Sequence, residues 1–372
     1  MYKIKHADAE EVIKKHLEEG DFMKEVQKLM WTYMTKDAWD YYYKKDCRVK
    51  LKVKKDSDTY RFLEKYSKEE NLKKLLVGDF GIQCEIIKDV YEGIPNAYSE
   101  GKKMKKRFIP IGERKDDVPK DSNKEIDDFN SIMRSLFEDQ LYEGKSTKLP
   151  RINKEKTVSR LGLRVCPYCG RTYIFSVSLE REGKTVKVKP QIDHFLPKSQ
   201  FPFLAVNIYN LIPSCTPCNM APAKGDQSPL VDFGKRELRI MHPYLFDDKA
   251  ITFLYDAHSE APYDASEMDI KVDYHGNTLL KSGYNGFFFI DELYKYHNVE
   301  AHNLYVRMKT YKSKAEIAYK EAGLPADFWE HLPELFIGYP LTEDQAMIHP
   351  LFKFNKDIYE QLLDDFEAGK MR

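Results

Sequence analysis

Apolar residues recur at helical spacing in two stretches of the first 150 residues of this chain. Over Glu10–Leu29 and over Asn130–Tyr142 they return at every third or fourth position. This period places apolar side chains along one face of a helix. The pattern therefore predicts a helix over each stretch and a mostly helical lobe over residues 1–150.

An alternating pattern lies between these two stretches. In Arg48–Lys55, basic residues alternate with Val49, Leu51 and Val53. A period of two is typical of a strand, here with one basic face. Two interpretations are open: an edge strand that its lysines protect from pairing with other chains, or an edge that faces nucleic acid. We favour the first, because lysine-rich edges occur in proteins of every function.

Residues 100–127, with the basic run Lys102–Arg107 and several Pro and Gly, indicate a long loop or linker.

The middle of the chain predicts a β-hairpin and then a short helix. Aromatic and β-branched residues are frequent in Arg171–Leu179 and in Thr185–Phe195, and Glu182–Lys184 supplies a turn between them. We expect the second strand to end at Asp193-His194. Cys215–Lys224 indicates a knuckle that runs into a helix, which a proline keeps short.

The last part of the chain mixes short apolar runs with helical patterns. We expect an α+β protein in three parts: a mostly helical lobe with a basic linker at 1–150, a metal-binding module at 151–235, and a mixed, then helical lobe at 236–372. Within the last part, strands are predicted at Ile251–Tyr255, Ile270–Tyr274 and Asn277–Leu280, and helices over Asp291–Ala322 and Glu343–Ala368 with a break at Pro350.

Composition and charge narrow the class of protein. Of the 372 residues, 42% are hydrophobic and 32% charged, which is ordinary for a globular chain. The sequence begins without an apolar signal core, and no apolar run approaches a membrane span, so we expect a cytoplasmic protein without a membrane partner. The net charge is zero, yet residues 151–230 hold twelve Lys or Arg and five Asp or Glu, a local charge of +7. A phosphate-binding surface requires such a concentration of positive charge.

Two Cys-x-x-Cys pairs, Cys166/Cys169 and Cys215/Cys218, are the strongest chemical signal in the chain. Thiolates at this spacing reach one ion from a tight turn, and a second pair completes a tetrahedron with no open position for water. We therefore expect a structural Zn²⁺ at these four cysteines. A redox role would not require two matched pairs.

Polar residues that suit phosphodiester hydrolysis lie between and beside the cysteines. Adjacent residues at a strand end point to opposite sides, so Asp193 can hold a cation while His194 faces an attacking water. Asn210 follows in the same stretch, and a knuckle pinned by zinc would place Asn219, next to Cys218, near Asp193.

These motifs resemble the HNH endonuclease family. The likeness lies in Asp193–Ser199 (Asp-His-Phe-Leu-Pro-Lys-Ser), Asn210–Asn219 and Lys224–Asp226, and it covers about residues 160 to 230. It implies a ββα-metal, or treble-clef-like, finger, which would contain the structural zinc expected from the cysteines. The hydrophobic patterns on both sides predict the largely helical lobes that flank it. It also implies a metal-dependent hydrolase that acts on DNA.

A narrower similarity concerns HNH proteins of bacterial anti-phage systems of the Septu and retron types. It lies in Cys166–Cys169, His194–Ser199 and Met241–Tyr244. It implies an effector of antiviral defence that works with a partner such as an ATPase.

The family resemblance implies a role for each motif residue. His194 corresponds to the general base, Asn210 to the residue that holds the catalytic loop and orients the base, and Asp193 and Asn219 to the ligands of a catalytic ion. Asn219 stands where many members have His, and Ala223 where some have a further His ligand. Oxygen ligands suit Mg²⁺ or Mn²⁺ better than a second zinc.

The expected reaction is in-line attack of water on a phosphate. His194 takes the proton of the water, since an imidazole with a pKa near ~6.5 can do so close to neutral pH. The divalent ion contacts the phosphate and the leaving 3′ oxygen, where charge develops. Lys198, Arg171 and Lys224 are candidates for phosphate contacts, with plain surface charge as an equally weighted alternative.

Two rival functions are compatible with these motifs. A non-catalytic zinc module that binds nucleic acid or a partner protein would need the cysteines, but it would have no need of Asp193-His194 at a strand end. The nuclease is favoured for that reason. The motif alone does not separate a DNA-directed nuclease from an RNA-directed one.

Overall fold

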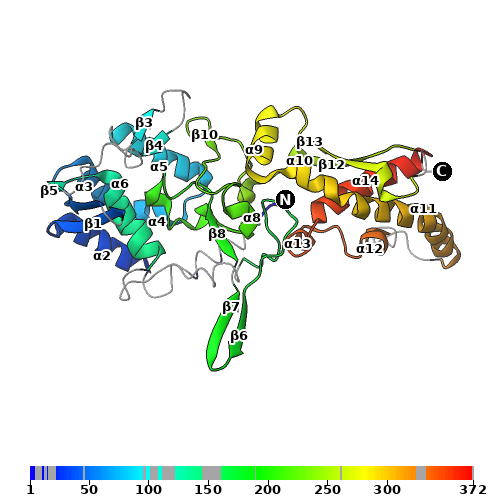
Figure 1. Cartoon of the computed structure of the whole chain (residues 1–372), viewed down its shortest axis with the longest axis horizontal. Helices are drawn as coiled ribbons and strands as arrows, with labels where there is room; N and C mark the ends of the chain where they lie inside the picture. The colour runs from blue at the N-terminus through cyan, green and yellow to red at the C-terminus, as the bar shows by residue number, and fades with distance from the viewer. Residues whose placement is uncertain are drawn as a thin grey trace.

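Helices and small sheets alternate along an elongated molecule (Figure 1). The elements of the N-terminal third lie at one end and those of the last third at the other, with the elements of the middle of the chain between them. Within the residues described, no helix is both long enough and apolar enough to cross a bilayer. The computed structural model describes residues 1–4, 11, 15, 22–44, 47–94, 98–100, 108–110, 122–144, 161–188, 190–259, 262–323 and 332–370.

A three-stranded sheet lies in the N-terminal lobe. Its order is β1 (Trp39–Lys44), β2 (Cys47–Leu51) and β5 (Ser122–Ile126), with β2 antiparallel to β1 and parallel to β5. The alternating pattern predicts β2 correctly, because Val49 and Leu51 are buried. Its predicted place at an edge is wrong, since β2 is the central strand.

Two basic residues of the alternating stretch, one in β2 and one directly after it, form ion pairs with acidic residues of the neighbouring strands. Arg48 pairs with Asp40 of β1 at 2.9 Å, and Lys52 pairs with Glu125 of β5 at 3.4 Å. Local alternation reports which side chains face water. It carries no information about the acidic residues that a distant strand brings to the same face.

The helices predicted for this lobe are confirmed where the structure describes them. α2 begins at Phe22 and forms the second half of the predicted Glu10–Leu29 helix, most of whose first half lies outside the described residues. α6 continues directly into the π-helix η3, which together cover the predicted Asn130–Tyr142 helix. The basic run Lys102–Arg107 also lies outside the described residues. The elements are α2 (Phe22–Thr35), α3 (Asp58–Tyr66), α4 (Glu69–Val77), α5 (Phe80–Gly93), β3 (Tyr98–Glu100), β4 (Phe108–Pro110), α6 (Phe129–Met133) and η3 (Arg134–Tyr142).

The central module contains two separate two-stranded ribbons. β6 (Val177–Arg181) and β7 (Lys184–Val188) form the predicted hairpin, which projects from the body of the molecule (Figure 1). β8 (Gln191–His194) does not extend β7 but pairs antiparallel with β9 (Leu211–Ser214). The prediction that one hairpin strand runs on to Asp193-His194 is therefore wrong.

A proline explains the separation of the two ribbons. Pro190 lies between β7 and β8 and has no N–H to donate to a strand ladder. The further elements of the module are η4 (Pro202–Leu204), η5 (Ile208–Asn210), α8 (Thr216–Asn219), β10 (Leu230–Asp232), β11 (Glu237–Leu238) and η6 (Pro243–Leu245).

The last part of the chain combines one β-ribbon with helices, as predicted, except at one element. The strand predicted at Asn277–Leu280 is wrong, because this segment begins α9: the Asn277 side chain caps it by accepting from the Leu280 N–H at 3.0 Å. The break at Pro350 is confirmed between α13 and α14. The elements are η7 (Asp248–Ala250), β12 (Thr252–Ala257), η8 (Ala265–Glu267), β13 (Met268–Asp273), α9 (Thr278–Phe288), α10 (Ile290–Tyr294), η9 (Lys295–His297), α11 (Asn298–Glu321), α12 (Leu332–Ile337), α13 (Glu343–Ala346) and α14 (Phe352–Glu367).

One connected cluster of buried apolar side chains runs through all three parts of the chain. Met1, Tyr2 and Ile4 belong to it, and the Ile4 N–H donates to the carbonyl oxygen of Pro243 at 3.0 Å. The first residues of the chain are thereby packed into the central module.

Candidate functional site

The first cysteine pair lies on a tight turn. The Cys166 N–H donates to the Thr172 carbonyl oxygen at 2.9 Å, and the Gly170 N–H donates to the Cys166 carbonyl oxygen at 2.8 Å. Gly170 has φ +66°, a left-handed conformation that glycine adopts without steric cost. A Cβ at this position would lie 2.0 Å from the Met1 nitrogen. The glycine after Cys169 therefore permits both the turn and the close approach of the N-terminal segment.

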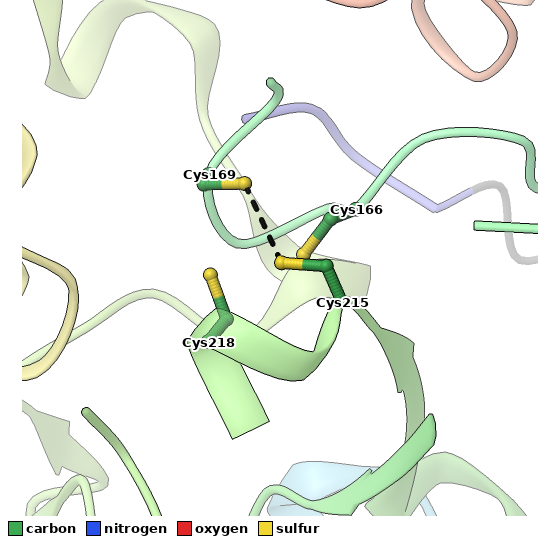
Figure 2. A group of neighbouring side chains, drawn as sticks. All are labelled: Cys166, Cys169, Cys215 and Cys218. Carbon is green, nitrogen blue, oxygen red and sulfur yellow. Dashed lines mark hydrogen bonds between the residues drawn. The ribbon is translucent and has the colours of Figure 1, made fainter. Parts of the chain in front are cut away.

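The second pair closes a four-cysteine cluster. Cys215 is the N-cap of α8, and its carbonyl oxygen accepts from the Cys218 N–H at 3.1 Å. Figure 2 shows the four thiols converging from the two turns, and all four are buried and free of disulfides. Their sulfur atoms lie within 4.8 Å of one another, and those of Cys169 and Cys215 are 3.9 Å apart. Zinc with bonds of ~2.3 Å to sulfur spaces its ligands by about 3.8 Å, so the cluster can hold a zinc ion.

The thiols of the cluster differ in their acidity. Burial, and then the hydrogen bond with Cys169, raises the pKa of Cys166, and hydrogen bonds with the neighbouring thiols raise the pKa of Cys218. The hydrogen bond with Cys166 lowers the pKa of both Cys169 and Cys215. Four buried thiols cannot all ionise without a cation. An ion that binds them displaces protons, so its affinity falls as the pH falls.

Two tyrosines from distant parts of the chain close over the first turn. The Tyr2 hydroxyl donates to the Val165 carbonyl oxygen, and the Tyr294 hydroxyl of α10 donates to that of Cys169 at 2.6 Å. Both side chains are buried. The cluster is therefore fastened to the N-terminal segment and to the C-terminal lobe.

His194, the expected general base, ends strand β8. Its Nε2 lies 2.9 Å from the carbonyl oxygen of Ala205, and its ring packs edge-on against Tyr142 with the centroids 4.5 Å apart. A carbonyl oxygen can only accept, so Nε2 carries the proton of the neutral ring and Nδ1 carries the lone pair. His194 is only 7% exposed. The basic atom of this ring is therefore Nδ1.

Asn210 spans the loop that follows His194. It is fully buried, and its Oδ1 accepts from the Leu196 N–H at 2.7 Å. Its Nδ2 donates to the carbonyl oxygens of Leu196 at 3.0 Å and Leu204 at 3.2 Å. Because Leu204 directly precedes Ala205, Asn210 fixes the peptide chain that orients the His194 ring.

Asp193, the expected metal ligand, lies in a buried polar cluster instead. Its Oδ1 accepts from the Lys224 ammonium at 2.9 Å, and its Oδ2 accepts from the Tyr168 hydroxyl at 2.5 Å. The ammonium also donates to the His194 carbonyl oxygen at 2.7 Å. Asp193 is 3% exposed and Lys224 is fully buried.

A divalent ion between Asp193 and Asn219 does not fit this arrangement. Both oxygens of Asp193 accept hydrogen bonds, one of them from a cation that would repel a second cation. The Asn219 amide donates to Gln191 Oε1 at 2.5 Å. Among the described residues, the four cysteines are the one group of three or more His, Cys, Asp or Glu side chains placed to hold an ion. We therefore derive no catalytic step through a second metal.

Two of the three residues expected to contact phosphate, Lys224 and Arg171, are bonded to other side chains of the protein. Lys224 cannot reach a phosphate, because it is fully buried against Asp193, and this expectation is wrong. Arg171 is half-buried, and its Nε donates to His297 Nε2 at 2.8 Å. Both side chains are therefore engaged within the protein, Lys224 by Asp193 and Arg171 by His297.

The third expected contact, Lys198, faces the π-helix η3. Its ammonium lies 2.8 Å from Glu138 and 3.1 Å from Glu143, and 5.1 Å from the ring centroid of Tyr142. The same helix also contacts Ser199, the residue after Lys198. The Arg134 guanidinium donates to the Ser199 carbonyl oxygen at 2.6 Å. One element of the N-terminal lobe thus covers this loop.

Two residues of the site were missed from the sequence. Tyr168 lies inside the first Cys-x-x-Cys pair, so its closeness to the cysteines was visible, but nothing in the spacing indicates its bond to Asp193. Tyr142 comes from a helix of the other lobe and carries no sequence signal for its contact with His194.

No protein-family model matches the chain, and neither a curated protein nor a solved structure matches it.

Proposed function

We propose that the chain is an HNH-type endonuclease that hydrolyses phosphodiester bonds in DNA, with His194 as general base. The observation that carries the proposal is the 2.9 Å contact between His194 Nε2 and the Ala205 carbonyl oxygen, at the end of a ribbon that leads into the four-cysteine cluster. In the tautomer that this contact favours, Nδ1 is the basic nitrogen of the ring. The order β8, β9, α8 supports a ββα-metal finger.

In the proposed reaction, His194 Nδ1 takes a proton from the water that attacks the phosphorus atom. Asn210 keeps the loop closed and so holds the Ala205 carbonyl oxygen against Nε2, which stabilises the useful tautomer. A zinc ion bound by four thiolates would supply rigidity, because no coordination position remains for water or substrate. Opening of the cover formed by Tyr142 is required before a phosphate reaches His194.

A second candidate function is a non-catalytic zinc module that binds nucleic acid or a partner protein. The burial of His194 and the ion pair that occupies Asp193 favour it. It predicts zinc without hydrolysis. RNA as the substrate is the third alternative, since nothing in the described residues of the module distinguishes the two backbones.

We extend the proposal to antiviral defence, with a cytoplasmic location and a partner ATPase. It rests on the likeness of Cys166–Cys169 and Met241–Tyr244 to anti-phage HNH proteins. The second motif lies behind the site: the His242 ring packs on Phe195, next to His194, with centroids 4.2 Å apart. The motif thus has a packing role close to the proposed base.

The testing experiment compares the purified protein with two variants on supercoiled plasmid and on RNA, with Mg²⁺, Mn²⁺ or a chelator of divalent ions. The proposal expects nicking by the wild type and by His275→Ala, an exposed histidine of the C-terminal lobe, and none by His194→Ala. Zinc without cleavage of either substrate would favour the interaction module. Equal cleavage by all three proteins would exclude His194 as the base.

A further inference from the structure

A buried ammonium lies where the motif pattern places a metal ion. Lys224 Nζ is 2.9 Å from Asp193 Oδ1 and 2.7 Å from the His194 carbonyl oxygen, and the lysine side chain has no exposed surface. Tyr168 binds the other oxygen of the carboxylate. The negative charge of Asp193 is thus compensated within the protein itself, which a buried carboxylate requires.

We propose that Lys224 is the resident cation of this site and a positioning residue for His194, and that Asp193 does not act as a ligand of a divalent ion. The positioning half of the proposal rests on the proposed nuclease function. The assignment of Lys224 as the cation that pairs with Asp193 holds whether or not the protein is a nuclease.

The backbone of Lys224 shows how it can position His194. The Lys224 N–H donates to the Cys218 carbonyl oxygen at 3.2 Å, and the following Gly225 N–H donates to that of Asn219 at 3.1 Å. Its main chain is therefore fastened to the second cysteine turn, while its ammonium holds the main chain of His194. Lys224 connects the four-cysteine cluster to the proposed base through one side chain.

The alternative is that Lys224 is a temporary occupant that Mg²⁺ or Mn²⁺ displaces. Displacement would strand an ammonium away from water, because the Lys224 side chain has no exposed surface. Leaving one half of a buried ion pair without its partner is strongly unfavourable. The geometry therefore favours a permanent pair.

Binding of Mn²⁺, measured by calorimetry on zinc-loaded protein, tests the cation directly. We expect wild type and Asp193→Asn to give the same isotherm, and Lys224→Met to bind Mn²⁺ more tightly because it releases the carboxylate. The double variant Asp193→Asn/Lys224→Met should lose that gain. A loss of about tenfold or more in affinity for Asp193→Asn alone would overturn the proposal. If Lys224→Met does not fold, the comparison of wild type, Asp193→Asn and the double variant still decides.

Activity and stability of the double variant test the positioning role. Removing both charges restores thermal stability relative to either single variant, since no unpaired buried charge remains. The bond from Lys224 to the His194 carbonyl oxygen is still missing, so nuclease turnover should stay about 10- to 100-fold low. Recovery of activity together with stability would overturn the positioning role. A wild type that cuts nothing would reject the proposed function and leave the Mn²⁺ result intact.

Discussion

His194 Nε2 lies 2.9 Å from the carbonyl oxygen of Ala205, eleven residues further along the chain. Neither position alone indicates this contact, because Ala205 has no polar side chain. The contact arises from the loop between β8 and β9, which Asn210 closes from inside with three hydrogen bonds. It determines which ring nitrogen is basic.

Replacement of His194 by Ala should abolish cleavage and leave the zinc in place. A general base contributes about 10²- to 10⁴-fold to a rate. The zinc should stay because the group of side chains that can hold it consists of the four cysteines alone. Plasmid nicking and elemental analysis on the same preparation measure both quantities. Loss of zinc in His194→Ala would show that His194 supports the four-cysteine cluster and would contradict the separation of the base from the zinc site.

Asn210→Ala should destabilise the fold as well as reduce activity. It removes the partner of three buried backbone groups, and each unsatisfied group costs about 1–3 kcal/mol. We expect a loss of at least about 3 kcal/mol in the free energy of unfolding, measured in urea. The matched control is Asn71→Ala, which removes one exposed hydrogen bond to Lys65. Similar midpoints for the two variants would show that Asn210 does not hold the loop.

The sequence was sufficient for the four-cysteine cluster and for most helices, and insufficient for the partners of the charged residues. Cys-x-x-Cys spacing is a local rule, because each turn places its own two thiols. Lys224 was expected at a surface, but contacts with Asp193, thirty-one residues away, place it in the core. Glu138 and Glu143 likewise reach Lys198 from another lobe. Burial of a charge depends on such long-range pairs, which no local pattern carries.

Cys166→Ser should reduce the zinc content and loosen the central module. A serine hydroxyl is a poor zinc ligand, and the remaining three thiols leave the tetrahedron incomplete. Cys84→Ser is the matched control, because Cys84 is buried and lies outside the cluster. We expect close to one zinc per chain in wild type and Cys84→Ser, and a marked deficit in Cys166→Ser, by elemental analysis of anaerobic preparations. Equal zinc in all three would reject the tetrathiolate site.

Acid should release the zinc from the wild type. Burial raises the pKa of Cys166, so protons compete for this thiol more effectively than for an exposed one. As the pH falls, protons displace the ion, and release should be complete before the helices melt. A chromogenic zinc indicator and circular dichroism, followed over the same titration, measure the two events. Zinc retained after the helical signal is lost would contradict the four-thiolate site.

Glu138→Gln with Glu143→Gln should strengthen DNA binding if Lys198 contacts phosphate. Burial lowers the pKa of Lys198, but the two carboxylates raise it by more, so the lysine is charged and held by both. Removing the carboxylates leaves the charge available to phosphate and also removes two negative charges. We expect affinity to rise about 3- to 10-fold at low salt and the gain to shrink as salt is added. Fluorescence anisotropy with a labelled duplex measures it, and Lys198→Ala in the same background should remove the part of the gain that Lys198 provides, leaving the part that comes from the two lost negative charges.

Gly170→Ala should destabilise the protein more than Gly183→Ala, although both glycines have a left-handed backbone. Gly170 has φ +66° and Gly183 has φ +71°, so an added Cβ costs each about 1–2 kcal/mol of strain. At Gly183, in the turn of the projecting hairpin, nothing lies within 4 Å of that Cβ, whereas at Gly170 the Met1 nitrogen lies 2.0 Å away. The clash adds about 1–3 kcal/mol and pushes the N-terminal segment off the first cysteine turn. Urea midpoints and zinc content should therefore fall together for Gly170→Ala, while Gly183→Ala should retain its zinc. Equal midpoints would mean that the N-terminal segment does not support the four-cysteine cluster.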